Sequence, residues 1–258
     1  MPEYSAVILA GGRSTRFGTT DLYKEKLGGK SLLCHPIDMC DADERCCEII
    51  VSVSPALRSW IEGDVLTFTS RKLKLADAQP SRMQSAVACA QLATAALLVV
   101  MDGNRPYLSE ELLEQVLREA KPGTGCAPAL DCTDVPAMRG AQIAQDAGET
   151  DFFGAKKLDA YQRHLLERHL ETGNAVLLQT PQAYQREDYL AKAAAAGEPA
   201  RFADDSELYV AGGGDVALVQ GRYGNFRVVS RGDLAIMQKI MGGPARKKKD
   251  GKYGGLGW

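Results

Sequence analysis

An apolar run that ends abruptly in glycines, close to the N-terminus, constrains the fold of this chain more than any other feature. Residues 6–10 read Ala-Val-Ile-Leu-Ala and are followed at once by Gly11 and Gly12. Consecutive aliphatic residues bounded by glycine are typical of a strand that is buried on both faces. The sequence therefore predicts a buried strand that leads into a glycine loop. A purely structural turn is the alternative, because glycines are common in turns.

The loop after this strand carries two arginines, Arg13 and Arg16, beside its glycines. Backbone N–H groups in a glycine loop can approach an anion closely, and guanidinium groups bind phosphate through paired hydrogen bonds. We therefore expect a polyphosphate site here. A later segment, Gly29-Lys30-Ser31, imitates the end of a P-loop, but Lys24 stands where that motif requires glycine and no strand leads into it.

Composition limits the class of protein. The chain has 258 residues, of which 45% are hydrophobic, and this is enough for one large α/β domain or two small ones. A net charge of −2 gives no case for nucleic acid as a partner, so we expect a small anionic ligand. The seven cysteines form an odd set without a CxxC pair, which favours reduced thiols in the cytoplasm. No segment resembles a signal peptide or a membrane span.

Alternating strands and helices predict an α/β fold with a doubly wound, mainly parallel sheet. After the first strand we expect strands at 48–53, 65–68, 97–101, 215–219 and 226–229. We expect helices around Ile37 and at 83–95, 109–120, 158–169, 188–196 and 233–241. Residues 134–175 are predicted to form an arm or insertion in a domain that spans 1–241. Residues 242–258 are predicted to be a disordered basic tail.

Asp102 follows the predicted strand 97–101 directly. Carboxyl ends of parallel strands form the rim where open α/β sheets bind ligands, so Asp102 and the glycine loop are expected on one rim. A helix cap or turn is the alternative role for such an aspartate. His164 and His169 lie five residues apart on a predicted helix, a spacing that disfavours a metal site.

Six segments, taken in order, resemble the 2-C-methyl-D-erythritol 4-phosphate cytidylyltransferases. Each is weak alone, but the set covers residues 5–241. They are Leu9-Ala10-Gly11-Gly12-Arg13-Ser14-Thr15-Arg16-Phe17-Gly18, Arg82-Met83-Gln84-Ser85-Ala86-Val87, Asp102-Gly103-Asn104-Arg105-Pro106, Thr180-Pro181-Gln182, Ala203-Asp204-Asp205-Ser206 and Asn225-Phe226-Arg227.

The resemblance implies a Rossmann-like nucleotidyltransferase that transfers CMP from CTP to a polyol phosphate and releases pyrophosphate. It further implies Mg²⁺ as cofactor and a homodimer. The acceptor phosphate would attack the α-phosphorus in line, with no covalent enzyme intermediate. Catalysis would then depend on positioned cations that stabilise charge on the phosphoryl oxygens.

The resemblance also assigns roles to individual residues. Those expected to be catalytic are Arg16, Lys24 and Arg227, with Lys26 as the rival to Lys24. Those expected to bind the nucleotide are Ala10, Gly11, Gly12, Arg82, Ser85 and Asp102, and Asp102 is also the expected metal ligand. Those expected to bind the acceptor are Asp102, Arg105, Thr133, Thr180 and Arg227. Arg82 and Asp205 have an alternative role in holding loops in place.

Some positions depart from the family pattern. Arg227 stands where the family usually has lysine, Gln79-Pro80-Ser81 lacks the family's glycines, and Thr172 falls where an arm arginine is expected. The acceptor therefore stays open between 2-C-methyl-D-erythritol 4-phosphate and another polyol or sugar phosphate such as ribitol 5-phosphate. Another nucleotide, or a non-catalytic nucleotide-binding module, is the remaining alternative.

Overall fold

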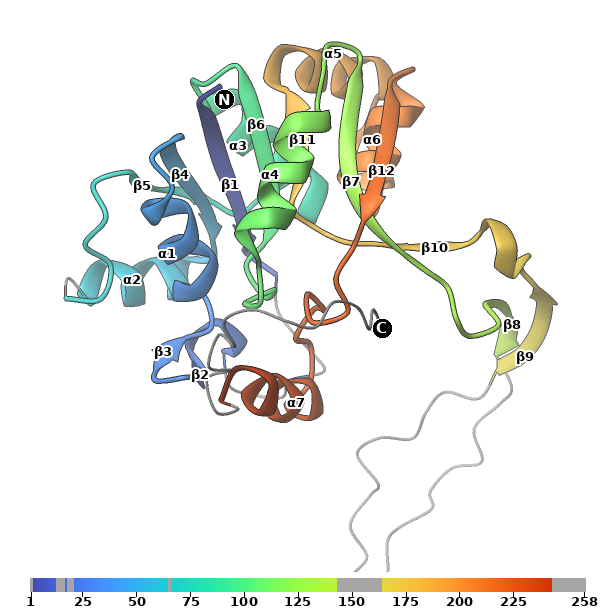
Figure 1. Cartoon of the computed structure of the whole chain (residues 1–258), viewed down its shortest axis with the longest axis horizontal. Helices are drawn as coiled ribbons and strands as arrows, with labels where there is room; N and C mark the ends of the chain where they lie inside the picture. Colours follow the sequence, from blue (N-terminus) through green and yellow to red (C-terminus); the bar gives the residue numbers. More distant parts are fainter. Residues whose placement is uncertain (1, 13–16, 18–20, 65, 143–163, 243–258) are drawn as a thin grey trace, which may run out of the picture. The chain divides into compact units, whose positions relative to one another are not determined.

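The computed structural model describes residues 2–12, 17, 21–64, 66–142 and 164–242. The chain divides into two compact units (Figure 1). The first consists of Met1–Pro128 together with Gln179–Trp258, and the second consists of Ala129–Leu178. Within the described residues, no helix is long and apolar enough to cross a membrane. All seven cysteines are free thiols.

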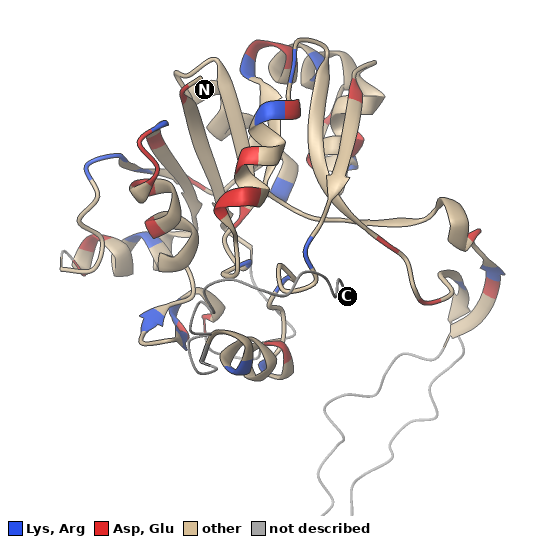
Figure 2. Ribbon diagram, in the orientation of Figure 1, with Lys and Arg blue, Asp and Glu red and all other residues tan. Residues whose placement is uncertain are grey.

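The first unit contains a parallel set of four strands. β1 (Tyr4–Ala10) lies between β6 (Leu97–Asp102) and β4 (Cys46–Val53), and β4 pairs with β5 (Leu73–Asp77). Every residue of β1 and β6 is buried, as expected for strands covered on both faces. In Figure 2 most of each central strand carries no charged side chain. The predicted buried strand at residues 6–10 and the central strand at 97–101 are therefore confirmed.

The other half of the sheet is antiparallel. β11 (Gln182–Gln185) lies between β6 and β7 (Thr124–Asp131) and runs antiparallel to both, and β12 (Asp215–Gln220) also pairs with β7. The expected α/β fold is confirmed, with a sheet that is mixed rather than parallel throughout. Because β11 runs antiparallel to β6, the segment just before β11 lies next to the C-terminal end of β6.

Helices cover both faces of the sheet. Tyr4, Ala6 and Ile8 of β1 join one buried cluster with α1, α2 and α4, whereas Val7 and Leu9 join another with α3, α5 and α6. This alternation along one strand is what a sheet packed on both faces requires. The helices are α1 (Cys34–Ala42), α2 (Pro55–Gly63), α3 (Arg82–Leu92), α4 (Glu110–Glu119), α5 (Arg186–Ala196), α6 (Asp205–Ala211) and α7 (Arg231–Gly242).

Local sequence explains where several helices begin. Ser81 caps α3 through its side chain, and Gln84 reaches back to the Ser81 backbone, which completes a capping box. Ser54 and Ser109 cap α2 and α4 in the same way, through N–H groups three residues on. Short elements complete the first unit: η1 (Leu22–Lys24), the hairpin strands β2 (Lys26–Leu27) and β3 (Lys30–Ser31), and η3 (Pro199–Arg201).

The segment that imitates a P-loop is the turn of this small hairpin. Gly28 and Gly29 have φ values of 58° and 88°, and Lys30 pairs with Leu27 across the turn. Such backbone angles favour glycine over other residues. These glycines therefore serve the turn, in agreement with the prediction that the segment is not a P-loop.

The second unit contains an extended pair of strands. β8 (Ala137–Gln142) pairs antiparallel with β9 (His164–His169), and β10 (Val176–Leu178) pairs with the end of β7 after the short helix η2 (Thr172–Asn174). The helix predicted at 158–169 is therefore wrong for residues 164–169, which form a strand; 158–163 lie outside the described residues. Leu165 and Leu166 are both exposed, so no buried surface favours a helix here.

Two further predicted strands are wrong. Leu66 and Thr67 lie in a turn closed by Asp64, whose carbonyl accepts bonds from the N–H groups of Thr67 and Phe68, and the strand comes later, as β5. Val65 lies outside the described residues. Residues 226–229 form no strand, and the backbone of Val228 instead bonds Asn104 in the loop after β6.

Candidate active site

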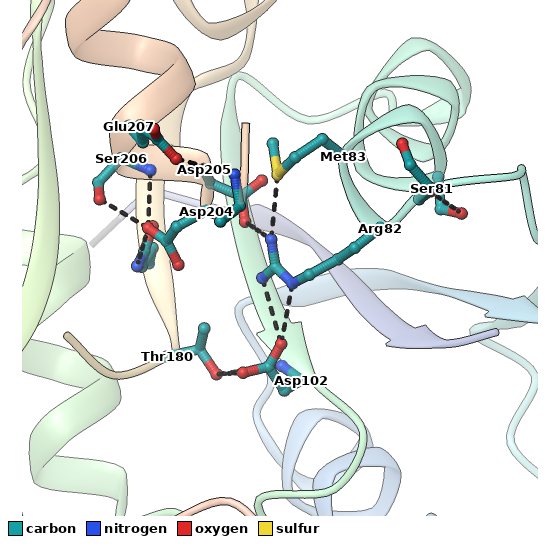
Figure 3. Close-up of polar contacts among 12 residues, drawn as sticks. Ser81, Arg82, Met83, Asp102, Thr180, Asp204, Asp205, Ser206 and Glu207 are labelled. Carbon is teal, nitrogen blue, oxygen red and sulfur yellow. Dashed lines mark hydrogen bonds and ion pairs between the residues drawn. The ribbon is translucent and has the colours of Figure 1, made fainter. Parts of the chain in front are cut away.

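Asp102 lies at the end of β6 and is almost fully buried. Its backbone N–H donates to Oγ1 of Thr180 (3.0 Å), and the Thr180 hydroxyl donates back to Oδ2 of Asp102 (3.4 Å; Figure 3). Thr180 lies two residues before β11, the antiparallel neighbour of β6. The mixed sheet thus joins two predicted site residues that are 78 positions apart.

Three guanidinium groups converge on the Asp102 carboxylate. Arg227 donates to Oδ2 through Nε (3.1 Å) and Nη2 (2.7 Å), and Arg105 donates to the same oxygen through Nε (3.1 Å). Arg82 donates to Oδ1 through Nε (3.2 Å). All three arginines were predicted as site residues, and the structure brings them together around one carboxylate.

This arrangement fixes the charge of Asp102. Burial alone would raise the pKa of its carboxyl, but the nearby guanidinium groups of Arg82, Arg227 and Arg105 outweigh burial and hold the pKa well below its usual range. Asp102 is therefore an anion over the whole physiological range. Asp205 also pairs with Arg82, so three cations share two carboxylates, and the positive charge that remains suits an anionic ligand.

A cavity of about 570 Å³ opens beside this cluster. Its walls include the ends of three neighbouring parallel strands, at Leu9, Ser52 and Asp102, and the loop that leads into α3. The predicted rim of strand ends is thus a real cavity. The lining residues are Leu9, Gly11, Gly12, Leu22, Tyr23, Ser52, Gln79, Pro80, Ser81, Arg82, Ser85, Asp102, Asn104, Arg227 and Val229.

The two loop glycines differ in what they require. A Cβ atom on Gly11 would lie 2.2 Å from the Cβ of Ala78, whereas a Cβ on Gly12 would meet none of the described residues within 4 Å. The absence of a side chain at Gly11 therefore allows the loop to pack against Ala78, the residue after β5. Ala10 itself is buried at the end of β1 and does not line the cavity.

Ser85 lines the cavity, and its hydroxyl is already engaged. Its Oγ accepts from the backbone N–H of Gln79 (2.9 Å) and donates to the carbonyl of Ser81 (3.0 Å). Ser85 thereby closes the 79–81 loop onto α3. These two hydrogen bonds therefore hold residues 79–81 where they line the cavity.

Lys24 and Lys26 are close in sequence to residues that line the cavity, but neither lysine lines it. The Lys24 ammonium lies 5.5 Å from the ring centre of Trp60 and 3.9 Å from Oδ2 of Asp21. Lys26 is exposed. Their neighbours Leu22 and Tyr23 do line the cavity, so the choice between the two lysines stays a prediction.

The structure does not test two of the predicted site residues. Arg16 lies outside the described residues. Thr133 belongs to the second compact unit, where it is exposed. Both assignments stay predictions.

Sequence reasoning did not predict part of the site. Asn104, Ser52 and Tyr23 line the cavity, and buried Asn225 holds Arg105 through its carbonyl (2.5 Å). The signal for Ser81 was present, since Ser-x-x-Gln before an apolar helix is a capping box and marks the loop ahead of it. Asn225 belongs to a segment that resembles the family, but its contact with Arg105 was not predicted, because the two residues are 120 positions apart.

The chain matches the MobA-like NTP transferase domain over residues 6–172. The chain belongs to this family. Residues 171–243 match the 2-C-methyl-D-erythritol 4-phosphate cytidylyltransferase family. The predicted family is therefore confirmed, and the protein is a nucleotidyltransferase-family enzyme.

Full-length relatives agree with this assignment. The 2-C-methyl-D-erythritol 4-phosphate cytidylyltransferase of Geobacillus kaustophilus is 27% identical over 93% of this chain and 97% of its own length. That of Cereibacter sphaeroides is 28% identical over 92% and 96%. The crystal structure of 4-diphosphocytidyl-2C-methyl-D-erythritol synthase from Anaerococcus prevotii gives a TM-score of 0.69 at 20% identity, over 93% and 96% of the two chains. This last similarity shows the shared fold.

Among the described residues that line the cavity, no side chain has the geometry of an activated nucleophile. The described lining has one carboxylate, two arginines, serines, amides and glycines. Such a set can hold anions and stabilise growing negative charge. It fits phosphoryl transfer between two bound substrates.

The described residues offer few ligands for a metal ion. Among the described residues, no group of three or more His, Cys, Asp or Glu side chains could hold a metal ion. Asp102 is the one carboxylate of the described cavity lining, and both of its oxygens are engaged by guanidinium groups. These residues alone do not form a Mg²⁺ site.

Proposed function

We propose that this enzyme transfers CMP from CTP to 2-C-methyl-D-erythritol 4-phosphate and releases pyrophosphate. The named activity of relatives that align over more than nine-tenths of the chain supports the substrates. The observation that carries the proposal is the cluster of Arg82, Arg105 and Arg227 on Asp102 beside the cavity. A site for two anions requires this kind of cationic surplus.

The three arginines differ in their freedom to bind a substrate. Arg105 is buried and also holds the carbonyl of Asn225, and Arg82 is also bound to Asp205. Arg227 is 43% exposed, and Asp102 is the only partner recorded for it in the described part of the chain. Arg227 can therefore turn toward an incoming phosphate while Arg82 and Arg105 keep Asp102 neutralised.

The reaction then follows from positioning. An oxygen of the acceptor phosphate attacks the α-phosphorus of CTP, the bond to the β-phosphate oxygen breaks, and pyrophosphate leaves with that electron pair. Arg227 holds the acceptor phosphate in line and the loop of Gly11 and Gly12, with Arg16, holds the triphosphate. Negative charge grows on the phosphoryl oxygens, and these fixed cations stabilise it.

We propose that Mg²⁺ enters bound to the triphosphate, since the described residues do not hold it alone. When bound, the ion would neutralise charge on the phosphates, and Asp102 is the residue that could share it. No step above depends on it. We further propose a cytoplasmic homodimer, a catalytic domain over residues 1–241 with an arm at 134–175, and acceptor contacts from Thr133 and Thr180.

The test is a pyrophosphate-release assay with CTP, Mg²⁺ and a panel of acceptors: 2-C-methyl-D-erythritol 4-phosphate, ribitol 5-phosphate and other polyol phosphates. We expect turnover with the first of these. Turnover with another acceptor alone would reassign the acceptor, and binding of CTP without release from any acceptor would exclude an enzymatic role.

In this assay we expect Arg227→Ala to lower kcat/KM about 100-fold or more, the usual cost of losing one charge-stabilising contact. Arg227→Lys keeps the charge and should retain activity to within about 10-fold. Arg118→Ala is the matched control, because Arg118 is exposed on α4 and pairs with Glu119. Equal activity in Arg227→Ala and the control would remove Arg227 from the mechanism.

The lysine assignment has its own test. We expect Lys24→Ala to abolish turnover and Lys26→Ala to leave most of it, because Lys24 is the better match to the family's phosphate-binding lysine. Steady-state kinetics of both variants with CTP decide the matter. The opposite result would give the role to Lys26.

A further inference from the structure

Arg82 bridges the cavity and the buried core. It is the first residue of α3, and the capping box of Ser81 and Gln84 fixes the backbone there. Its Nε donates to Oδ1 of Asp102 (3.2 Å), and its Nη1 donates to Oδ2 of Asp205 (2.6 Å; Figure 3). One guanidinium is thus held by two carboxylates that come from different elements, β6 and α6.

Asp205 is completely buried and does not line the cavity. Its second oxygen, Oδ1, accepts a hydrogen bond from the hydroxyl of Tyr189 on α5 (2.7 Å). Tyr189 packs among other buried aromatic rings, 5.2 Å from the ring centre of Tyr184, which in turn lies 4.9 Å from Tyr209. Both oxygens of Asp205 are therefore engaged, one by a tyrosine anchored in the core and one by Arg82.

A carboxylate in this position is costly. Burial raises the pKa of Asp205, which means that the surroundings disfavour its charged form, and Arg82 opposes that effect. A buried ion pair often stabilises a fold no better than apolar residues of the same size. Stability is thus a poor reason for an aspartate here, and its contact with a cavity residue points to the site.

One nitrogen of the Arg82 guanidinium makes no hydrogen bond among the described residues. This atom, Nη2, is buried and lies 3.2 Å from Oδ1 of Asp102 as an ion pair. The Arg82 side chain as a whole is 23% exposed and lines the cavity. What Arg82 presents to a bound anion is therefore the positive charge of a guanidinium fixed at Nε and Nη1.

We propose that Asp205 and Tyr189 are positioning residues that hold the Arg82 guanidinium at the cavity wall, where its positive charge faces the phosphates of the bound nucleotide. The proposal rests on the proposed function for the identity of that anion. Without Asp205, Arg82 would share one carboxylate with two other guanidinium groups. Repulsion among the three cations would then favour other Arg82 rotamers.

The first test needs no activity. In protein labelled with ¹⁵N-arginine, a guanidinium held at two sides rotates slowly and gives resolved Nη signals, which Arg82→Gln assigns by their loss. We expect Asp205→Asn to average these signals, and Tyr189→Phe to broaden them. Tyr209→Phe and Glu207→Gln are matched controls: Tyr209 belongs to the same aromatic group, Glu207 to the same helix, and neither contacts Arg82. Unchanged Arg82 signals in both Asp205→Asn and Tyr189→Phe would overturn the proposal.

The second test is a kinetic double-mutant cycle. We expect Asp205→Asn to raise the KM for CTP and to lower kcat/KM about 10- to 100-fold. In the Arg82→Gln background the same change should have almost no further effect, because its target is gone. A full additional loss in that background would mean that Asp205 acts through general stability, and would overturn the proposal that Asp205 acts by positioning Arg82. If Asp205→Asn does not fold, Tyr189→Phe completes the same cycle with a smaller loss.

The two proposals fail in different ways. A wild-type protein without turnover on any acceptor would refute the proposed function, while the arginine signals would still report whether Asp205 holds Arg82. If the wild type is active and Asp205→Asn and Tyr189→Phe change neither the kinetics nor the arginine signals, only the positioning role of Asp205 and Tyr189 is refuted.

Discussion

Asp102 illustrates how single residues decide this site. Its carboxylate accepts from Arg82, Arg105 and Arg227, which lie 20, 3 and 125 positions away. A strand that ends in aspartate predicts a ligand rim, and this part follows from local sequence. The three guanidinium partners do not, because only the folded chain brings them to one carboxylate.

The loop glycines allow a sharp test at this scale. We expect Gly11→Ala to lower the free energy of unfolding by about 1 to 3 kcal/mol, because its Cβ would lie 2.2 Å from the Cβ of Ala78. In Gly12→Ala the new Cβ meets none of the described residues within 4 Å, so stability should change little. Urea unfolding measures both.

Rescue identifies the cause of any loss in Gly11→Ala. Ala78→Gly removes the opposing methyl group, so the double variant should recover most of the lost stability. No recovery would mean that Gly11 is needed for its backbone conformation or for a ligand, and that packing against Ala78 is not the reason.

At the level of elements, Glu48 ties three strands and a helix end together. From β4, its Oε1 accepts from Ser5 of β1 (2.6 Å) and from the backbone and hydroxyl of Thr94 just after α3 (2.6 and 2.7 Å). Its Oε2 accepts from Lys74 of β5 (2.6 Å). Burial by itself would raise the pKa of Glu48, but these bonds lower it to about 2.

This shift predicts how stability depends on pH. A glutamate in the unfolded chain has a pKa of about 4.3. The contribution of ionised Glu48 to the free energy of unfolding is therefore fully present above that pH, and it is lost as the pH falls toward 2. We expect Glu48→Gln to cost up to about 3 kcal/mol at pH 7, and the difference from wild type to vanish near pH 2.

Denaturant unfolding at several pH values measures this difference. Glu114→Gln, at an exposed position on α4, is the control and should stay within about 0.5 kcal/mol of wild type. A Glu48→Gln difference that does not change between pH 7 and pH 3 would assign the loss to packing and not to charge.

For the whole molecule, predictions from sequence succeeded where a pattern was long and local. Apolar runs identified β1, β4 and β6, and a polar cap followed by an apolar face identified α4. Predictions failed where a segment depends on distant partners. The strand β9 forms by pairing with β8, and residues 226–229 are held by a hydrogen bond from Asn104 in the loop after β6.

Several elements were not predicted from the sequence, among them β7, β11, α2 and α6. β11 and α6 are short, with four and seven residues. β11 matters most for the site, because it makes the sheet mixed and sets Thr180 against Asp102. Three of its four residues are buried, between neighbours on both sides, which no window of sequence can show.

The sequence alone determined that the chain contains a buried strand, a glycine and arginine loop, and an aspartate at the end of a second strand, because each of these is a contiguous pattern. It also predicted the family, through the order of six short segments. Only the tertiary structure decided that Arg227 and Arg105 share Asp102, and that Asp205 reaches the site through Arg82. The physical reason is that buried charges must find partners in space, and sequence distance places no limit on which partners those are.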